Sequence, residues 1–124
     1  IRRPPRSTQS RSSAASDVYK RQIYMYLRVV TIKCPNQAAK KALKLLFKQV
    51  VIEQMKVGLI KETVIDISDT NFLNVKYWIS KSHFEKGRKN WQKVSQELNE
   101  MGAILSAVGG EGEINLSEDF QNYI

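Results

Sequence analysis

The chain has 124 residues, with 20 basic and 12 acidic side chains and a net charge of +8. This length supports one domain with a single core, and so basic a balance would by itself suggest a nucleic acid or an anionic membrane as partner. The single cysteine, Cys34, excludes an internal disulfide and a cysteine-based metal cluster, and no apolar run is long enough to span a membrane, so the expected location is the reducing cytoplasm.

The first twenty-two residues differ in composition from the rest of the chain. Between Arg2 and Ser16 there is no Ile, Leu, Val, Met, Phe, Tyr or Trp, and the segment holds five serines. Such a composition does not offset the conformational entropy lost on folding. The segment resembles a conceptual translation of sequencing-adapter DNA, and we expect residues 1–22 to be a non-native, disordered leader. A basic nucleic-acid-binding arm and a cleaved mitochondrial-type presequence are the natural alternatives.

Excluding this leader changes the charge argument. The leader carries six basic residues and one acid, so the rest of the chain holds 14 basic and 11 acidic side chains, a net charge of +3. That value is ordinary for a small domain, and we therefore expect neither a nucleic acid nor a membrane as partner. Met25 is a candidate initiator. The expected division is a leader at 1–22, a domain at 23–116 and a C-terminal tail at 117–124.

Four strands are predicted from alternating polarity or from β-branched and aromatic residues. They cover residues 24–34, 59–67, 72–79 and 103–108. The third strand has an apolar face and a mixed face. The apolar face holds Leu73, Val75, Tyr77 and Ile79, and the mixed face holds Asn74, Lys76 and Trp78. Gly109-Gly110 is expected to break the fourth strand before residues 113–116.

Two helices are predicted between these strands. Asn36 can cap the first, and Gly58 fits the left-handed position that often follows a helix. Ser82 and Glu85 have capping-box spacing, which predicts the start of the second helix, and its apolar stripe ends at Gly102. The element order predicts an α+β, ferredoxin-like βαββαβ fold, a four-stranded antiparallel sheet with two helices on one face. The other face must meet solvent, a ligand or a second sheet.

The segment from Trp78 to Phe84 (WISKSHF) resembles the strand-to-helix junction of the antibiotic-biosynthesis-monooxygenase superfamily, where a W-x-S pattern recurs. The resemblance in element order and length extends from about Met25 to Val108. It implies a ferredoxin-like subunit that pairs sheet to sheet into a dimeric α+β barrel, with a cavity between sheet and helices. Some members oxidise quinol-like aromatic substrates without metal or flavin, some open haem, and many have no known activity.

The expected function is that of a cofactor-independent monooxygenase acting on a small aromatic or quinone-like molecule, in a pocket near Tyr26, Arg28, Asp66 and Trp78. Tyr26 can donate a hydrogen bond, and Arg28 with Asp66 can orient a phenolic oxygen. The structural alternatives are a strand aromatic, a cross-strand ion pair and a packing role for Trp78. A non-catalytic dimeric module that binds a small ligand or serves as a scaffold is the alternative function, because a fold does not settle function.

No metal, haem or other cofactor is expected. The haem-degrading branch pairs the Trp with an Asn on the first strand and a His in the second helix, and both are missing in this sequence. The only histidine, His83, lies at the start of the second helix, where a surface position is expected. Trp91 lies on the apolar stripe of that helix and is expected in the core. We expect a homodimer formed through the open sheet face, with Trp78 in the interface.

Overall fold

The computed structural model describes residues 22–117. The chain divides into two units, one from Met25 to Gly112 and one made of residues 1–24 and 113–124. The predicted leader, except for its last residue, and the tail from residue 118 onward lie outside the described residues. Neither helix in the described part combines the length and the apolar character needed to cross a membrane.

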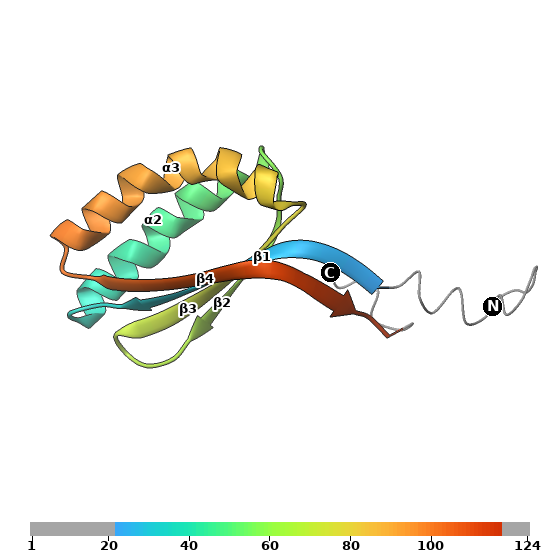
Figure 1. The fold of residues 1–124 in the computed structure, drawn as a ribbon. Coiled ribbons are helices and arrows are strands. Elements are labelled where there is room, and N and C mark those ends of the chain that lie inside the picture. Colours follow the sequence, from blue (N-terminus) through green and yellow to red (C-terminus); the bar gives the residue numbers. More distant parts are fainter. Residues whose placement is uncertain (1–21, 118–124) are drawn as a thin grey trace, which may run out of the picture. The chain divides into compact units, whose positions relative to one another are not determined.

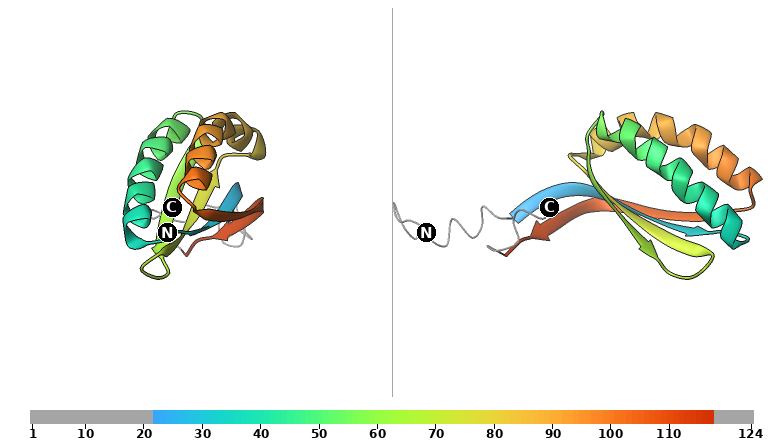
Figure 2. Two further views of the ribbon diagram at one scale, coloured as in Figure 1. Left: turned by 90° about the vertical axis from the view of Figure 1, so that its left-hand side faces the viewer. Right: turned by 180° about the vertical axis from the view of Figure 1, so that it is seen from behind.

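The described residues form four strands and two helices (Figure 1). In chain order these are β1 (Gln22–Lys33), α2 (Gln37–Met55), β2 (Leu59–Asp66), β3 (Asn71–Trp78), α3 (Lys81–Glu100) and β4 (Ile104–Asn115). The antiparallel sheet has the order β2-β3-β1-β4, and α2 and α3 lie together over one of its faces (Figure 2). The predicted α+β, ferredoxin-like fold is confirmed.

The first helix begins and ends as its sequence predicts, whereas the second begins two residues earlier. Asn36 accepts a hydrogen bond from the backbone N–H of Ala39 at 2.8 Å, and Gly58 follows the helix with φ of 115°. In α3 the cap is Ser80, not Ser82, because Ser80 has extended backbone angles and its Oγ accepts from the N–H of His83 at 3.3 Å. Ser82 already lies in the first turn of the helix.

The fourth strand runs from Ile104 to Asn115 without the predicted break at Gly109-Gly110. β4 lies beside β1 in the sheet. A Cβ atom added at Gly109 would lie 2.5 Å from Cδ of Arg28 and 2.7 Å from Oη of Tyr26. Gly109 therefore leaves room for two side chains of the neighbouring strand and does not form a turn.

Burial alternates along β3 and shows which sheet face the helices cover. The buried side chains are Phe72, Asn74, Lys76 and Trp78, and the half-buried ones are Leu73, Val75 and Tyr77. The mixed face of the strand is thus the covered one, and the prediction that Trp78 lies on the open face is wrong. Assigning the faces by polarity failed because Asn74 and Lys76 face a cavity and not solvent.

The main core lies between the covered face of the sheet and the two helices. Its completely buried members are Ile32, Leu43, Phe72 and Leu98. The Phe47 ring lies 5.5 Å from that of Phe72 and 5.3 Å from that of Trp91. These aromatic contacts tie both helices to the sheet, and Trp91 also lines the cavity described below.

Candidate functional site

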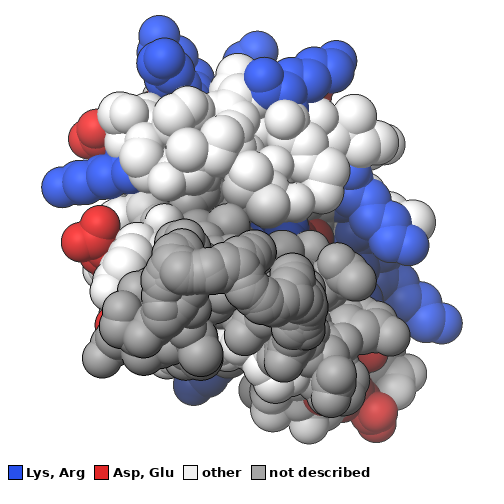
Figure 3. Space-filling view, turned by 90° about the vertical axis from the view of Figure 1, so that its right-hand side faces the viewer, with Lys and Arg blue, Asp and Glu red and all other residues white. Residues whose placement is uncertain are grey.

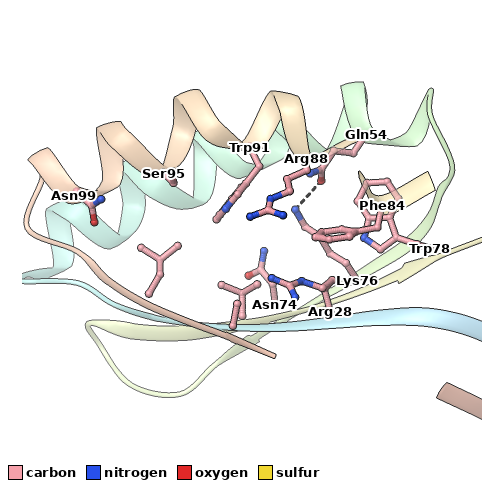
Figure 4. Close-up of a pocket in the computed structure, with 13 residues that line it drawn as sticks. Arg28, Gln54, Asn74, Lys76, Trp78, Phe84, Arg88, Trp91, Ser95 and Asn99 are labelled. Carbon is pink, nitrogen blue, oxygen red and sulfur yellow. Dashed lines mark hydrogen bonds between the residues drawn. The ribbon is translucent and has the colours of Figure 1, made fainter. Parts of the chain in front are cut away.

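A cavity of about 330 Å³ lies between the sheet and the helices (Figure 4). Its volume falls within the range of small-molecule sites. The lining residues come from β1, β3, β4 and both helices, so the site forms only when the whole domain folds. The aromatic lining residues are Trp78, Phe84 and Trp91, the charged ones are Arg28, Lys76 and Arg88, and the amide ones are Gln54, Asn74 and Asn99.

The floor of the cavity is built by the covered face of β3. Asn74, Lys76 and Trp78 are two residues apart, and alternate residues of a strand point to the same side. Lys76 lies opposite Arg28 on β1 and opposite Glu62 on β2. A row of three charged residues therefore crosses the sheet beneath the helices.

Two buried polar atoms in the floor have no hydrogen-bond partner, namely Oδ1 of Asn74 and Nε1 of Trp78. Asn74 is 1% exposed and Trp78 is 0% exposed. Nδ2 of Asn74 donates to Oε2 of Glu62 at 3.0 Å, which leaves the amide oxygen of Asn74 on the other side. A buried polar atom without a partner costs about 1–3 kcal/mol, so these two atoms, on residues that line the cavity, are places where a ligand or a water can supply a hydrogen bond.

Lys76 is the most strongly buried charged group of the site, with 5% of its surface exposed. Its Nζ donates to Oε1 of Gln54 at 2.7 Å, lies 3.9 Å from Oε2 of Glu62 and lies 5.2 Å from the ring centre of Trp91. Burial lowers the pKa of Lys76 to about 8, against the opposing effect of the Glu62 charge. Burial likewise raises the pKa of Glu62, against Lys76 and the hydrogen bond from Asn74. Burial thus disfavours the charged form of both members of this pair.

The charged side chains that line the cavity are all cations. Figure 4 shows the guanidinium groups of Arg28 and Arg88 pointing into the same space as the amine of Lys76. The Arg28 guanidinium lies 4.7 Å from the ring centre of Phe84. Among residues 22–117 neither arginine forms an ion pair. Two cations without a carboxylate partner favour a ligand that carries negative charge or an electron-rich oxygen.

The structure brings three of the four predicted site residues together and places the fourth elsewhere. Arg28 and Trp78 line the cavity, and the ring of Tyr26 lies 5.2 Å from that of Phe84, next to the lining. Asp66 is 59% exposed and binds Lys40 and Lys44 of α2 at 3.0 and 2.9 Å.

The predicted ion pair between Arg28 and Asp66 is therefore wrong. β3 separates the strands that carry these residues. Asp66 also lies opposite Phe72, whereas Arg28 lies opposite Lys76, two positions farther along the same face. In this strand order β1 and β2 are not neighbours, so the two side chains do not meet across adjacent strands.

Sequence reasoning did not select Asn74, Lys76 or Arg88. The available signal was the repeat of polar residues at positions 74 and 76 beside the aromatic residue at 78, on one face of a strand. Trp91, expected in the core, is half-buried and forms a wall of the cavity. His83 lies outside the cavity lining, with Nδ1 2.7 Å from Oγ of Ser80. No group of three His, Cys, Asp or Glu converges as a metal site within residues 22–117.

A second, more open hollow lies where α2 ends and α3 begins. It is lined by Met55, Gly58, Ile60, Ile79 and Lys86, among others. Figure 3 views the molecule from the side on which α3 begins, and Lys and Arg side chains there surround a region of uncharged ones. No buried polar group without a partner lies in this hollow among the described residues, so the cavity between the sheet and the helices is the stronger candidate site.

The chain is similar to several solved structures in its fold. No family model and no curated protein matches its sequence. A candidate antibiotic biosynthesis monooxygenase from Deinococcus radiodurans has a TM-score of 0.64 at 14% identity, over 75% of this chain and 97% of that one. SnoaB, a cofactor-independent oxygenase from Streptomyces nogalater, has a TM-score of 0.53 at 11% identity, over 77% and 96%.

A dimeric ferredoxin-like protein from an uncultured marine organism has a TM-score of 0.53 at 13% identity, over 77% of this chain and 99% of that one. These matches show that the chain has a ferredoxin-like fold. At such identities a shared fold does not transfer an activity, so the function has to be argued from the cavity itself.

Proposed function

We propose that the cavity binds a small phenol- or quinol-like aromatic molecule and that the protein oxidises this molecule with dioxygen without a cofactor. The observation that carries the proposal is the unpartnered acceptor and donor in the cavity floor, Oδ1 of Asn74 and Nε1 of Trp78. A hydroxyl group both donates and accepts, so one hydroxyl can pair with Oδ1 of Asn74 and another with Nε1 of Trp78. The two residues are four apart in β3, on the order of 13 Å along the strand, so a ligand with hydroxyls at opposite ends of its ring, such as a hydroquinone, suits both atoms. The aromatic walls suit the ring of such a ligand.

The charges of the cavity favour the reactive form of that ligand. A phenolate reacts more readily with dioxygen than a phenol because it is richer in electrons. The cations of Arg28, Lys76 and Arg88 line this cavity and would stabilise a negative oxygen within it. For a hydroquinone the overall reaction balances as hydroquinone plus dioxygen giving hydroxyquinone plus water, so one oxygen atom enters the ring and the other leaves as water.

The structural neighbours support this reaction class, since SnoaB is a cofactor-independent oxygenase. The alternative is a module that binds the same ligand and does not transform it. Both functions use the same cavity, and they differ only in whether the bound ligand consumes dioxygen.

We further propose that two copies pair through the open sheet face. Leu73, Val75 and Tyr77 of β3 lie opposite Thr31, Val29 and Leu27 of β1 and form an apolar strip. Neither helix of the described domain covers this strip (Figure 1). An aromatic side chain such as Tyr77 can contribute about 2 kcal/mol or more to an interface. The dimeric ferredoxin-like neighbour supports the pairing of two copies. In the face proposed here, Tyr77 takes the place of Trp78 as the aromatic anchor.

The test combines ligand binding with oxygen consumption. Hydroquinone and catechol are titrated against the protein by tryptophan fluorescence, and dioxygen uptake is followed with an oxygen electrode. Saturable binding with stoichiometric uptake and a quinone product is expected. Binding without uptake would support the non-catalytic alternative, and the absence of binding would contradict both functions.

One variant tests the observation that carries the proposal. Trp78→Phe keeps an aromatic wall and removes the unpartnered donor, so we expect hydroquinone to bind about tenfold more weakly, in line with one lost hydrogen bond. Gln92→Ala, at an exposed position on α3, is the control and should bind normally. Unchanged affinity in Trp78→Phe would mean that Nε1 does not contact the ligand.

A further inference from the structure

We propose that Lys76 is a nucleophilic lysine that forms a Schiff base with small aromatic aldehydes or ketones in the cavity. This inference rests on the aromatic ligand binding of the proposed function and does not require the oxidation. It assigns a covalent chemistry to a residue that so far only contributes charge to the site.

Lys76 is placed so that its amine can react with a molecule bound in the cavity. The residue lines the cavity, only 5% of its surface is exposed, and its amine lies 5.2 Å from the ring centre of Trp91. The hydrogen bond to Oε1 of Gln54 at 2.7 Å holds the amine in one place (Figure 4). An aromatic aldehyde that lies against the wall would present its carbonyl carbon to a fixed nitrogen.

The amine is also available in its reactive form near neutral pH. Only an unprotonated amine attacks a carbonyl, and enzymes produce it by removing a lysine from water or by placing it near other cations. Lys76 meets the first condition, since burial lowers its pKa to about 8 against the opposing effect of Glu62. At pH 8 about half of such amines are neutral, which is on the order of a hundred times the neutral fraction of an ordinary exposed lysine.

The groups that face Lys76 come from every element packed against it. β1 contributes Arg28, β2 contributes Glu62, and α3 contributes Arg88. The contacts from α2 and β4 are uncharged. Among the side chains that these elements place against Lys76, Glu62 is thus the one carboxylate. Its negative charge opposes the loss of the proton from Lys76.

The reaction balances without an oxidant or a reductant. Nζ of Lys76 forms a bond to the carbonyl carbon, and the electron pair of the C=O double bond moves to oxygen, which takes up a proton. The resulting carbinolamine loses this oxygen as water, and the C=N double bond forms. Glu62, 3.9 Å from Nζ and with a raised pKa, can accept the proton of the amine and return it to the departing hydroxyl.

Trp78 can position the carbonyl for this attack. It follows Lys76 by two residues on the same face, on the order of 7 Å along the strand. Its unpartnered Nε1 can donate to the carbonyl oxygen while Lys76 attacks the carbon. The atom that supports binding of a phenol would then also polarise an aldehyde, which makes Trp78 a positioning residue for the covalent step.

The experiment traps the Schiff base by reduction. The full-length protein is incubated with benzaldehyde and sodium cyanoborohydride between pH 6 and pH 10, and the modified residue is identified by peptide mass mapping. We expect one benzyl group on Lys76, with half-maximal labelling near pH 8. At pH 7.5 its labelling should exceed that of Lys48, exposed on α2, by at least about tenfold.

Variants and a competitor identify the site. Lys76→Arg keeps the charge and should abolish the selective label, whereas Lys48→Arg should leave it unchanged. Glu62→Gln removes the negative charge that supports the protonated amine, so half-maximal labelling should move to lower pH. Hydroquinone, which has no carbonyl group, should protect Lys76 by occupying the cavity.

The outcomes separate this inference from the proposed function. If hydroquinone binds but Lys76 is labelled no faster than Lys48, the Schiff-base inference is overturned and the proposed function stands. If Lys76 is labelled and hydroquinone neither binds nor protects, the lysine chemistry holds and the phenol site is wrong. If neither compound enters the cavity, both proposals fail.

Discussion

Gly87 of α3 lies directly against the six-membered ring of Trp78. A Cβ atom added at Gly87 would lie 2.8 Å from Cζ3 of Trp78 and nearer still to Cη2. The glycine is fully inside a helix, where it weakens the helix by about 1 kcal/mol relative to alanine. Its benefit is a close contact between helix and sheet that gives the ring of Trp78 room beside the backbone of α3 at the cavity.

Gly87→Ala is therefore expected to destabilise the protein although alanine is the better helix former. Overpacking a buried contact costs about 1–3 kcal/mol, which exceeds the gain in helix propensity. The free energy of unfolding, measured in urea, should fall by roughly 1–2 kcal/mol. In a Trp78→Phe background the smaller ring leaves room, so the same substitution should become neutral or stabilising. An equal loss in both backgrounds would show that the clash is not with Trp78.

Because the amine of Lys76 is buried, the free energy of unfolding should change with pH in the alkaline range. Its pKa is about 8 in the folded protein, against 10.5 for an ordinary exposed lysine, so the unfolded chain binds more protons between these values. The free energy of unfolding should therefore rise with pH from 8 to 10.5, by up to about 3 kcal/mol from this group alone.

Lys76→Met isolates that contribution from the other titrating residues. The difference in unfolding free energy between wild type and Lys76→Met should change by this amount between pH 7.5 and pH 10.5. Measurements in urea at both pH values provide the test. A difference that is constant with pH would mean that the amine is solvated in the folded protein.

The proposed dimer predicts which substitutions produce a monomer. Val75→Asp places a charge in the centre of the open apolar strip, where pairing would bury it without a partner, so it should separate the subunits. Val64→Asp adds the same charge at an exposed position of β2 and is the matched control. Light scattering at micromolar concentration should report two chain masses for the control and one for Val75→Asp. A monomeric wild-type protein would contradict the proposal.

Two nearby serines at the start of α3 have different roles, since Ser80 caps the helix and Ser82 lies in its first turn. Ser80→Ala removes the acceptor for the N–H of His83 and should lower the free energy of unfolding by about 1 kcal/mol, as expected for loss of a helix cap. Ser82→Ala keeps that acceptor and should change stability by less than about 0.5 kcal/mol. Thermal unfolding of the two variants side by side provides the comparison. The reverse order would support the capping box at Ser82 and Glu85 that the sequence predicts.

Local sequence signals determined the elements of this domain. Asn36 and Gly58 act within a few residues of their own positions, so the ends of α2 could be read without knowledge of the fold. The order of strands and helices then predicted the ferredoxin-like topology, because few arrangements bury two helices on one four-stranded sheet. The same signals misplaced the cap of α3, since Ser80 and Ser82 both fit a cap by residue type.

Which side chains line the cavity depends on the tertiary structure and could not be read from local sequence. Alternation in β3 showed that Asn74, Lys76 and Trp78 share a face, but it could not show that the helices cover this polar face. The choice depends on the packing of α2 and α3 over the whole sheet, which places apolar Leu73, Val75 and Tyr77 outside. Insertion of β3 between β1 and β2 likewise separates Arg28 from Asp66 and places Lys76 between Arg28 and Glu62. The register of pairing between strands far apart in the sequence aligns these three residues, and for that reason the charged row beneath the helices appears only in the folded domain.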